Sequence, residues 1–477
     1  MTHGHPRPGK AFVFFIQTPS DMETNSSSQA IPYLRGRVIA PNDADYDTAR
    51  KVHNGMIDKR PGLIAQCADE NDVAHAVRFA REHGLVVAVR GGGHNGAGLG
   101  VCDQGLVIDL SQMRQVTVDP EAQTIRAQGG CLLGDLDKAG HPHGLAVPTG
   151  INATTGIGGL TLGGGLGHLT RFAGLTIDNL LEATVVLASG DIVTASPAIN
   201  EDLFWAIRGG GGNFGVVTSF LFRAHNVHTV YGGPMFWDIS EAKAMMEWYQ
   251  DFIKQAPDTV SGFFNFHKIP PAPIFPEQYH LHLMCGIVWA CIDEEEANEV
   301  FEMVRKFRKP LIDAVGPMPV PVLQTMFDDL FVPGLQWYWK GDFVKQLSPE
   351  VMDVHIRHAH RIPNFFSGMH LYPINGAAGR VPNDATAWSY RDATWSMVIA
   401  GVSPEPSEKD VVTNFARDYW QELHPHGAGG AYVNFMMEEG ADRVKATYGS
   451  NYDRLVKVKS KYDPDNVFCV NQNIRPV

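Results

Sequence analysis

The sequence lacks several features that mark specialised classes of protein. None of its apolar runs approaches the ~18 residues that a membrane-spanning helix needs. It contains no run of lysine or arginine, and its formal net charge is −13, so we expect neither nucleic acid nor a membrane surface as a partner. Its six cysteines include no C-x-x-C pair, which favours buried thiols in a reducing compartment over a disulfide framework. The expected location is cytoplasmic.

The N-terminal segment also lacks the signature of an export signal. Its apolar cluster, residues 11–16, is shorter than the core of a signal peptide and has no small-residue cleavage site close behind it. The polar stretch at residues 20–29 is typical of a flexible leader, and Met22 is an alternative start of translation. We expect a flexible leader over residues 1–40.

The rest of the chain has the composition of a globular protein with more than one domain. Its 477 residues are 44% hydrophobic and 10% aromatic, which is enough to bury more than one core. Glycine clusters end and aromatic residues become frequent near residue 227. We therefore expect one domain over residues 41–227 and a second over residues 228–440.

Strand and helix patterns alternate along the first domain, but some strands are joined by short turns. Asn71 to His83 has a helical pattern with Asn71 as its expected N-cap, whereas residues 115–118 and 124–127 form a predicted hairpin. An α+β fold therefore fits better than a doubly wound parallel sheet. In the second domain, the patterns predict an antiparallel sheet backed by helices. Its expected strands include residues 281–291, 366–374 and 394–402, and its expected helices are residues 293–309, 351–362 and 407–423.

The first of three glycine-rich loops follows a predicted buried strand at residues 85–90. Its Gly91-x-Gly93-x-x-Gly96 spacing satisfies the dinucleotide-binding fingerprint, which requires that a helix follows. No helical pattern follows, because the next apolar run, residues 106–110, is strand-like. The loop is therefore a candidate phosphate cradle outside a Rossmann fold, with a simple tight turn as the alternative.

Two further glycine clusters support the phosphate interpretation. Residues 150–167 contain eight glycines, and Gly209 to Gly212 precede another strand-like run. Successive backbone N–H groups in such loops form concave sites for anions. Three of these loops within residues 91–218 indicate one extended anionic ligand that is held at several points.

Together these motifs resemble one known family. Arg90-Gly-Gly-Gly-His94, then Gly156-x-Gly-Gly-x-x-x-Gly-Gly-Gly-x-Gly167, then Gly209-Gly-Gly-Gly-Asn-Phe-Gly-Val-Val-Thr218 are similar to motifs of the FAD-linked oxidases of the vanillyl-alcohol oxidase superfamily. Residues 448–468 with Asn471-Gln472 match its berberine-bridge-enzyme-like branch. The resemblance implies a PCMH-type FAD-binding domain in two parts, to which residues 441–477 return after the substrate domain.

The resemblance implies FAD as the cofactor, bonded through a ring nitrogen of His94 to the 8α-methyl group of the flavin. Many relatives add a second link from a cysteine, but Asn152 occupies that position here, so we expect a single link. The small side chain of Thr155 is expected to give oxygen access to the flavin. The expected cofactor contacts are Arg90, Gly91, Gly92, Gly93, His94, Asn95, Gly96, Thr155, Gly156, Gly158, Gly159, Gly163, Gly212, Gly215, Val216 and Asn471.

The resemblance also implies a tyrosine that helps to deprotonate the substrate. Tyr432-Val-Asn434 matches a Tyr-x-Asn motif whose tyrosine faces the flavin in relatives. An ordinary tyrosine has a pKa near 10 and is a poor base at neutral pH, so we expect a nearby cation, with Lys340 as the candidate. The predicted strand at residues 394–402 has no carboxylate or lysine to assist it. His370 and Tyr372, on the neighbouring strand, are the next candidates.

The function implied by the resemblance is that of an FAD-dependent oxidase. It would remove a hydride from a C–H bond next to oxygen or nitrogen of a small, hydrophobic or cyclic substrate and reduce O₂ to hydrogen peroxide. The alternatives are a dehydrogenase or a carbohydrate oxidase on the same fold, and a non-catalytic flavin-binding protein. No metal is expected, because the scattered histidine pairs match no recognised ligand set. The expected assembly is a monomer or a homodimer.

Overall fold

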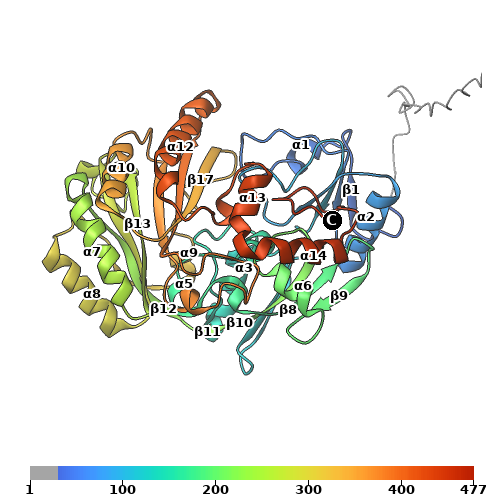
Figure 1. The fold of residues 1–477 in the computed structure, drawn as a ribbon, viewed down its shortest axis with the longest axis horizontal. Coiled ribbons are helices and arrows are strands. Elements are labelled where there is room, and N and C mark those ends of the chain that lie inside the picture. The colour runs from blue at the N-terminus through green and yellow to red at the C-terminus, as the bar shows by residue number, and fades with distance from the viewer. Residues whose placement is uncertain (1–30) are drawn as a thin grey trace, which may run out of the picture.

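The computed structural model describes residues 31–477 and contains three main sheets (Figure 1). The first is a small four-stranded sheet in the order β1-β2-β4-β3, with β2 and β3 both parallel to β4. No helix lies between β3 and β4, as the sequence predicts for the first glycine loop. The strands are β1 (Arg37–Ile39), β2 (Leu63–Gln66), β3 (Val87–Arg90) and β4 (Leu106–Asp109).

Around this sheet, α2 (Glu70–Glu82) starts two residues earlier than the sequence predicts. Its N-cap is Asp69, whose carboxylate accepts hydrogen bonds from the backbone N–H groups of Asn71 and Asp72. The predicted leader is too long, because β1 pairs with β2 and the side chain of Ile31 is buried. Only residues 1–30 of that leader lie outside the described residues.

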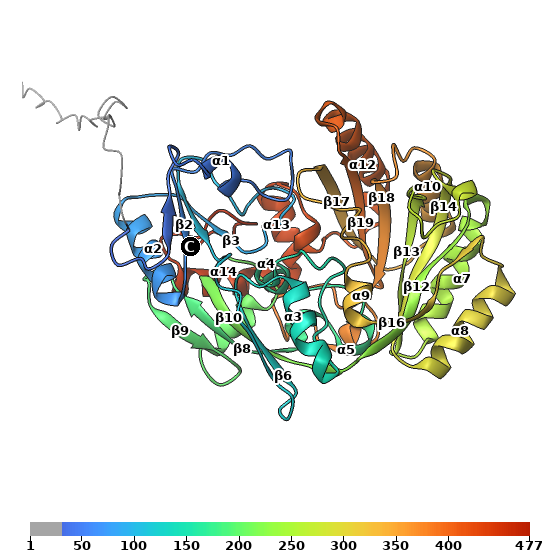
Figure 2. The ribbon, with the colours of Figure 1, turned by 180° about the vertical axis from the view of Figure 1, so that it is seen from behind.

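The second sheet is five-stranded and entirely antiparallel, in the order β5-β6-β10-β8-β9. It includes the predicted hairpin, whose tip projects from the molecule (Figure 2). Among the helices of this region, one contains part of the second glycine cluster and another ends just before the third. The strands are β5 (Val116–Asp119), β6 (Thr124–Gln128), β8 (Leu180–Val186), β9 (Ile192–Ala195) and β10 (Val216–Arg223). The helices are α3 (Leu133–Gly140), α4 (Ile157–Gly163), α5 (Thr170–Ala173) and α6 (Glu201–Ile207).

The third sheet is a broad antiparallel sheet that begins with β12, directly after the short strand β11 (His225–Asn226). Its path is β15-β12-β14-β13-β18-β19-β17, and β16 also pairs with β12. The strands are β12 (Thr229–Asp238), β13 (Val260–Lys268), β14 (Leu283–Cys291), β15 (Ile312–Asp313), β16 (Gly316–Pro319), β17 (Gln336–Val344), β18 (Gly368–Pro373) and β19 (Trp395–Ser403).

Helices cover one face of the third sheet, as the sequence predicts (Figure 1). They are α7 (Ala242–Gln255), α8 (Glu294–Phe307), α10 (Pro349–Ala359) and α12 (Lys409–Leu423). The ends of α8 follow the helix dipole: Asp293 caps its N-terminus through the N–H of Glu296, and Arg305 and Lys306 lie in its last turn.

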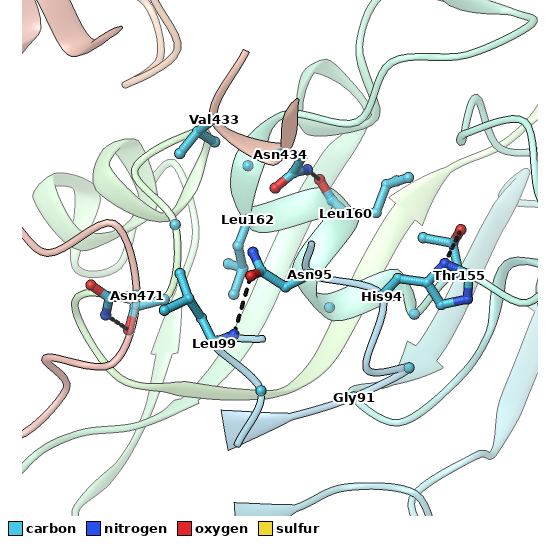
Figure 3. Close-up of a pocket in the computed structure, with 18 of the residues that line it drawn as sticks. Gly91, His94, Asn95, Leu99, Thr155, Leu160, Leu162, Val433, Asn434 and Asn471 are labelled. Atoms are coloured by element: carbon cyan, nitrogen blue, oxygen red, sulfur yellow. Dashed lines mark hydrogen bonds between the residues drawn. The ribbon is translucent and has the colours of Figure 1, made fainter. Parts of the chain in front are cut away.

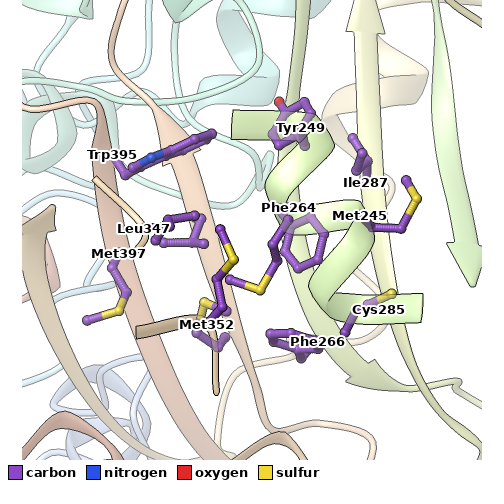
Figure 4. Packing of buried hydrophobic residues seen from close by; sticks show 14 of the residues in the cluster. Met245, Tyr249, Phe264, Phe266, Cys285, Ile287, Leu347, Met352, Trp395 and Met397 are labelled. Carbon is purple, nitrogen blue, oxygen red and sulfur yellow. The ribbon is translucent and has the colours of Figure 1, made fainter. Parts of the chain in front are cut away.

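The alternation of the strands divides the third sheet into two apolar faces. Phe264, Ile287 and Met397 point toward the helices, where Met245 and Tyr249 of α7 pack on them (Figure 4). Because successive strand residues point to opposite faces, the neighbours of these residues point away from the helices. The opposite face therefore presents Phe263, His370, Tyr372 and Val398 toward the glycine loops.

The C-terminal segment packs mainly against the second sheet, and Arg443 of its first helix also pairs with Asp342 on β17 of the third (Figure 1). Helices α13 (Ala441–Tyr448) and α14 (Tyr452–Tyr462) bury Tyr448 and Leu455 in the same core as Phe204 and Trp205 of α6. Among residues 31–477, no helix is both long and apolar enough to cross a membrane.

Candidate active site

A cavity of about 370 Å³ lies between the three glycine loops and the face of the third sheet that is turned away from the helices. Figure 3 shows the part of its lining that surrounds the glycine loops. This volume is in the range of ordinary small-molecule sites. The loops supply backbone and small side chains to one part of its wall, while β17, β18 and β19 supply aromatic and aliphatic side chains to another. Two regions far apart in the sequence therefore form one site.

Most of the residues predicted to contact the cofactor line this cavity. The exception is Gly96, which lies against the indole ring of Trp339, where a side chain on residue 96 would collide with it. Those that line the cavity are Arg90, Gly91, Gly92, Gly93, His94, Asn95, Thr155, Gly156, Gly158, Gly159, Gly163, Gly212, Gly215, Val216 and Asn471.

The first and second glycine loops touch backbone to backbone. A Cβ atom on Gly92 would collide with the backbone of Gly156, and a Cβ atom on Gly156 would collide with the backbone of Gly92. This contact fixes the first loop next to the start of α4. The glycines at this point are required by packing between the loops.

Other glycines of the site leave open space. Nothing lies within 4 Å of a Cβ atom built on Gly159 or Gly212, both of which line the cavity. Among residues 31–477, the only lysine or arginine side chain in the lining is Arg90, and its guanidinium donates a hydrogen bond of 2.9 Å to Asp109. An anionic ligand would therefore be held mainly by backbone N–H groups, as the loops predict.

The C-terminal segment supports the third glycine loop. The Lys459 ammonium is fully buried and donates to the carbonyl of Asn213, to that of Phe468 and to the carboxylate of Asp463. The Asn471 amide donates to the carbonyl of Gly212 at 3.3 Å. In the described part of the chain the buried Oδ1 atom of Asn471 has no hydrogen-bond partner, which leaves an acceptor available to a ligand in the cavity.

His94 is held by a relay of hydrogen bonds. Its Nε2 lies 2.9 Å from Thr154 Oγ1, and that hydroxyl donates to Asn152 Oδ1 at 2.6 Å. The Thr154 hydroxyl must therefore accept the His94 Nε2–H, which leaves the lone pair on Nδ1. The Nδ1 atom lies 3.5 Å from Thr155 Oγ1 (Figure 3). Burial lowers the pKa of His94 to about 3, so its ring is neutral at neutral pH.

His53 and Asn54 are parts of the site that the sequence analysis does not identify. The His53 ring stacks on the His94 ring with their centroids 3.9 Å apart. The Asn54 amide donates to the carbonyls of Gly96 and Trp337, and its Oδ1 accepts from Trp337 N–H. Both residues lie in an irregular segment without hydrophobic periodicity, so no sequence signal marks them.

Tyr432 lines the cavity, but its surroundings differ from the expected ones. Its hydroxyl accepts hydrogen bonds from Gly165 N–H at 2.9 Å and from the Asn434 amide at 2.8 Å. Burial nevertheless raises the pKa of Tyr432 to about 12. The Lys340 ammonium pairs with the Glu439 carboxylate at 2.8 Å and lies over the Trp420 ring. The expected lowering of the Tyr432 pKa by Lys340 is therefore wrong.

The other two candidate catalytic residues, His370 and Tyr372, also line the cavity. They lie on β18 next to β19, where Val398 and Ala400 add apolar lining. The structure thus brings all three candidates to one cavity with His94. No group of three or more His, Cys, Asp or Glu side chains within residues 31–477 is arranged to hold a metal ion.

Comparisons with known proteins agree with this arrangement. Residues 61–196 match a family model described as an FAD binding domain, and residues 431–475 match one described as berberine and berberine like. An FAD-linked oxidoreductase of Aspergillus fumigatus is 41% identical, with 93% of this chain and 98% of the relative covered. One of Dictyostelium discoideum is 31% identical, with 93% and 95% covered.

The fold has solved counterparts. The crystal structure of 6-hydroxy-D-nicotine oxidase from Arthrobacter nicotinovorans superposes with a TM-score of 0.85 at 26% identity, and the match covers 95% of this chain and all of that one.

Proposed function

We propose, because the chain belongs to the berberine-like family of FAD-linked oxidoreductases, that it is an oxidase with one covalent flavin link. It removes a hydride from a C–H bond next to oxygen or nitrogen of a small, hydrophobic or cyclic substrate. Molecular oxygen then takes up the two electrons and becomes hydrogen peroxide. The bound FAD supplies the redox chemistry, and the chain's own residues hold, orient and deprotonate the substrate.

The observation that carries this proposal is the shared cavity. The three glycine loops and His94 form one side of it, His370 and Tyr372 line it from the third sheet, and Tyr432 lines it next to the second glycine loop. The open space at Gly159 and Gly212 and the unpaired acceptor of Asn471 fit FAD. Because the described lining residues include no lysine or arginine other than the paired Arg90, the diphosphate would be held by backbone N–H groups.

The covalent link is assigned to His94 Nδ1. This atom keeps its lone pair because Nε2–H is engaged by Thr154. Asn152, at the position of the second-link cysteine, instead accepts from Thr154 and has no nucleophilic atom. We therefore propose a single covalent bond between the protein and the flavin.

The substrate side is apolar and aromatic, with few polar groups. Phe331, Trp337, Trp339 and Phe435 line it together with Val398. This lining fits a cyclic amine or an aromatic alcohol, and the similarity to 6-hydroxy-D-nicotine oxidase supports the cyclic amine class. We assign the Tyr432 hydroxyl, which is fixed by two donors, to orient the reacting oxygen or nitrogen.

The test has two parts. Acid precipitation of the purified protein should give a yellow pellet, and the flavin-bearing tryptic peptide should contain His94. Without oxygen, 6-hydroxynicotine, benzyl alcohol or cellobiose should bleach the flavin if it matches the substrate class. Free FAD in the supernatant would contradict the covalent link. No bleaching by any compound in a wider panel of alcohols, amines and sugars would favour a non-catalytic flavin-binding protein.

A further inference from the structure

Three buried side chains form a hydrogen-bonded chain that leads away from the cavity. The Tyr372 hydroxyl lies 2.7 Å from His370 Nδ1, and His370 Nε2 lies 2.7 Å from His267 Nε2. Tyr372 and His370 line the cavity from β18, whereas His267, on β13, is not part of its lining. Asn265 pairs directly with His370 across the two strands. His267 is therefore the diagonal neighbour of His370 on the same face of the sheet.

The bond between the two imidazole rings fixes where the protons lie. A hydrogen bond between ring nitrogens needs one N–H and one bare nitrogen. The backbone of Ser367 raises the pKa of His267, as a carbonyl oxygen that faces a ring N–H does. With Nε2 facing His370, that proton is on Nδ1 of His267. Its Nε2 is therefore bare and accepts from His370 Nε2–H.

The direction of the remaining bond follows. Because His370 carries its proton on Nε2, its Nδ1 is bare and accepts the Tyr372 O–H. Burial has the largest effect on the pKa of both rings. It lowers the pKa of His267 to about 4 and that of His370 well below its ordinary value. Both imidazoles are therefore neutral at neutral pH, and every link in the chain points from the cavity toward His267.

We propose that Tyr372, His370 and His267 form the proton relay that accepts the substrate's O–H or N–H proton during oxidation. The inference rests on the proposed function, because the relay acts while the substrate's hydride leaves to the flavin. Tyr372 receives the substrate proton on its oxygen and passes its own proton to His370 Nδ1. His370 passes its Nε2 proton to His267 Nε2.

The proton and electron balance closes. The substrate loses a hydride and a proton and gains a C=O or C=N bond. Tyr372 and His370 each break one O–H or N–H bond and form another, whereas His267 gains an N–H bond and breaks none, so the positive charge ends on the His267 ring beside Ser367. When O₂ takes up the two electrons and the proton that left the substrate as hydride, it also takes the second proton back from the relay and becomes hydrogen peroxide.

The hydroxyl groups of Tyr432 and Tyr372 differ in their hydrogen-bond partners. Tyr432 accepts from Gly165 and Asn434, so no base stands ready to receive its own proton. Tyr372 has two neutral histidines in line behind it. This difference assigns the proton-accepting role to Tyr372 and leaves Tyr432 to orient the substrate.

Nitrogen NMR of the flavin-loaded protein, labelled with ¹⁵N in histidine, tests the relay without a substrate. The ¹⁵N shifts should place the proton of His370 on Nε2 and that of His267 on Nδ1, with a coupling across the bond between the two Nε2 atoms. His370→Gln and His267→Gln assign the signals. A proton on Nδ1 of His370 would overturn the proposed direction.

Rapid mixing tests the role in catalysis, and the chain contains a matched control. Tyr419 and His355 form a second buried pair with a hydroxyl to Nδ1 distance of 2.7 Å, and neither residue lines the cavity. With whichever of 6-hydroxynicotine, benzyl alcohol or cellobiose bleaches the flavin, Tyr372→Phe and His370→Gln should slow anaerobic bleaching by roughly a hundredfold. Tyr419→Phe and His355→Gln should slow it by less than about threefold.

The outcomes separate the relay from the proposed function. If Tyr372→Phe slows bleaching no more than Tyr419→Phe, or if only Tyr432→Phe slows it strongly, the relay is wrong and the oxidase proposal stands. If none of the compounds bleaches the wild-type flavin, the result counts against the proposed function, and the NMR measurement still decides the relay.

Discussion

At the scale of single residues, the Thr154 hydroxyl is expected to control the covalent link. Thr154→Val keeps the shape of the side chain but removes the group that engages His94 Nε2–H. His94 then loses the partner that keeps the lone pair on Nδ1. The fraction of flavin that stays with the acid-precipitated protein should fall severalfold. Thr154→Ser should restore this fraction. An unchanged fraction in Thr154→Val would show that the hydrogen bond between His94 and Thr154 has no role in forming the covalent link.

His94→Ala tests whether FAD still binds when the covalent link cannot form. The glycine loops and Asn471 should still bind FAD, because their contacts do not involve the imidazole. The flavin should then appear entirely in the supernatant after acid precipitation. An apoprotein that no longer binds FAD would indicate that His94 is needed for the shape of the site.

Asp137 on α3 gives a prediction about pH. Burial raises its pKa from 3.8 to about 7, and Oδ2 has no partner in the described part of the chain. A raised folded-state pKa contributes stability that is present below pH 4 and is lost as the pH rises through 7. Asp137→Asn should therefore be more stable than the wild type at pH 8 by up to about 4 kcal/mol and similar to it near pH 4. Urea unfolding of both proteins across this range measures the difference, and a constant difference would contradict the assignment.

At the scale of elements, a substitution in the second glycine loop is expected to affect cofactor binding but not folding. Gly159 lies inside α4, where alanine favours the helix by about 1 kcal/mol, and its added methyl group would enter open space at the cavity. Gly159→Ala should leave the melting temperature of the apoprotein unchanged or higher but weaken FAD binding about tenfold or more.

The binding measurement uses the His94→Ala background, in which FAD binds reversibly. Gly316→Ala is the control, because Gly316 also has nothing within 4 Å of its Cβ position but lies on β16 outside the cavity lining. Equal FAD affinity for both alanine variants would mean that the cofactor does not pass Gly159.

Elements with a strong periodic pattern could be predicted from the sequence. The strand ending at Arg90, the hairpin of β5 and β6, and α8 with its Asp293 cap all form within a few residues of their expected positions. The face that each strand of the third sheet turns toward the cavity was beyond prediction, because both faces are apolar. The pairing of His267 with His370 was therefore also beyond prediction, since only the register between β13 and β18 brings the two side chains together.

At the scale of the whole molecule, Asn54 joins the two halves of the site. It is buried and connects Gly96 of the first loop to Trp337 of β17. Asn54→Ala leaves these backbone groups without partners, which typically costs about 1–3 kcal/mol. We expect a lower melting temperature and slower flavin bleaching. Gln123→Ala, which removes only an exposed hydrogen bond to Asn226, should change neither. Equal melting temperatures for the two variants would contradict the joining role.

The long-range contacts explain why the site was only partly predictable. The glycine motifs predict most of the loop residues that line the cavity, because such a motif depends on local backbone. Asn54 and Trp337 are separated by 283 positions, and no local pattern encodes such a pair. The error about Lys340 has the same origin, because its partner Glu439 lies on a distant segment.

The reaction of the reduced flavin with oxygen tests the central claim most directly, because it needs no knowledge of the substrate. The purified protein is reduced by light without oxygen and then mixed with aerated buffer in a stopped-flow spectrometer. For an oxidase with Thr155 leaving access to the flavin, the absorbance of the oxidised flavin should return within seconds and hydrogen peroxide should form in equal amount. Persistence of the reduced spectrum for minutes would contradict the oxidase assignment and identify a dehydrogenase.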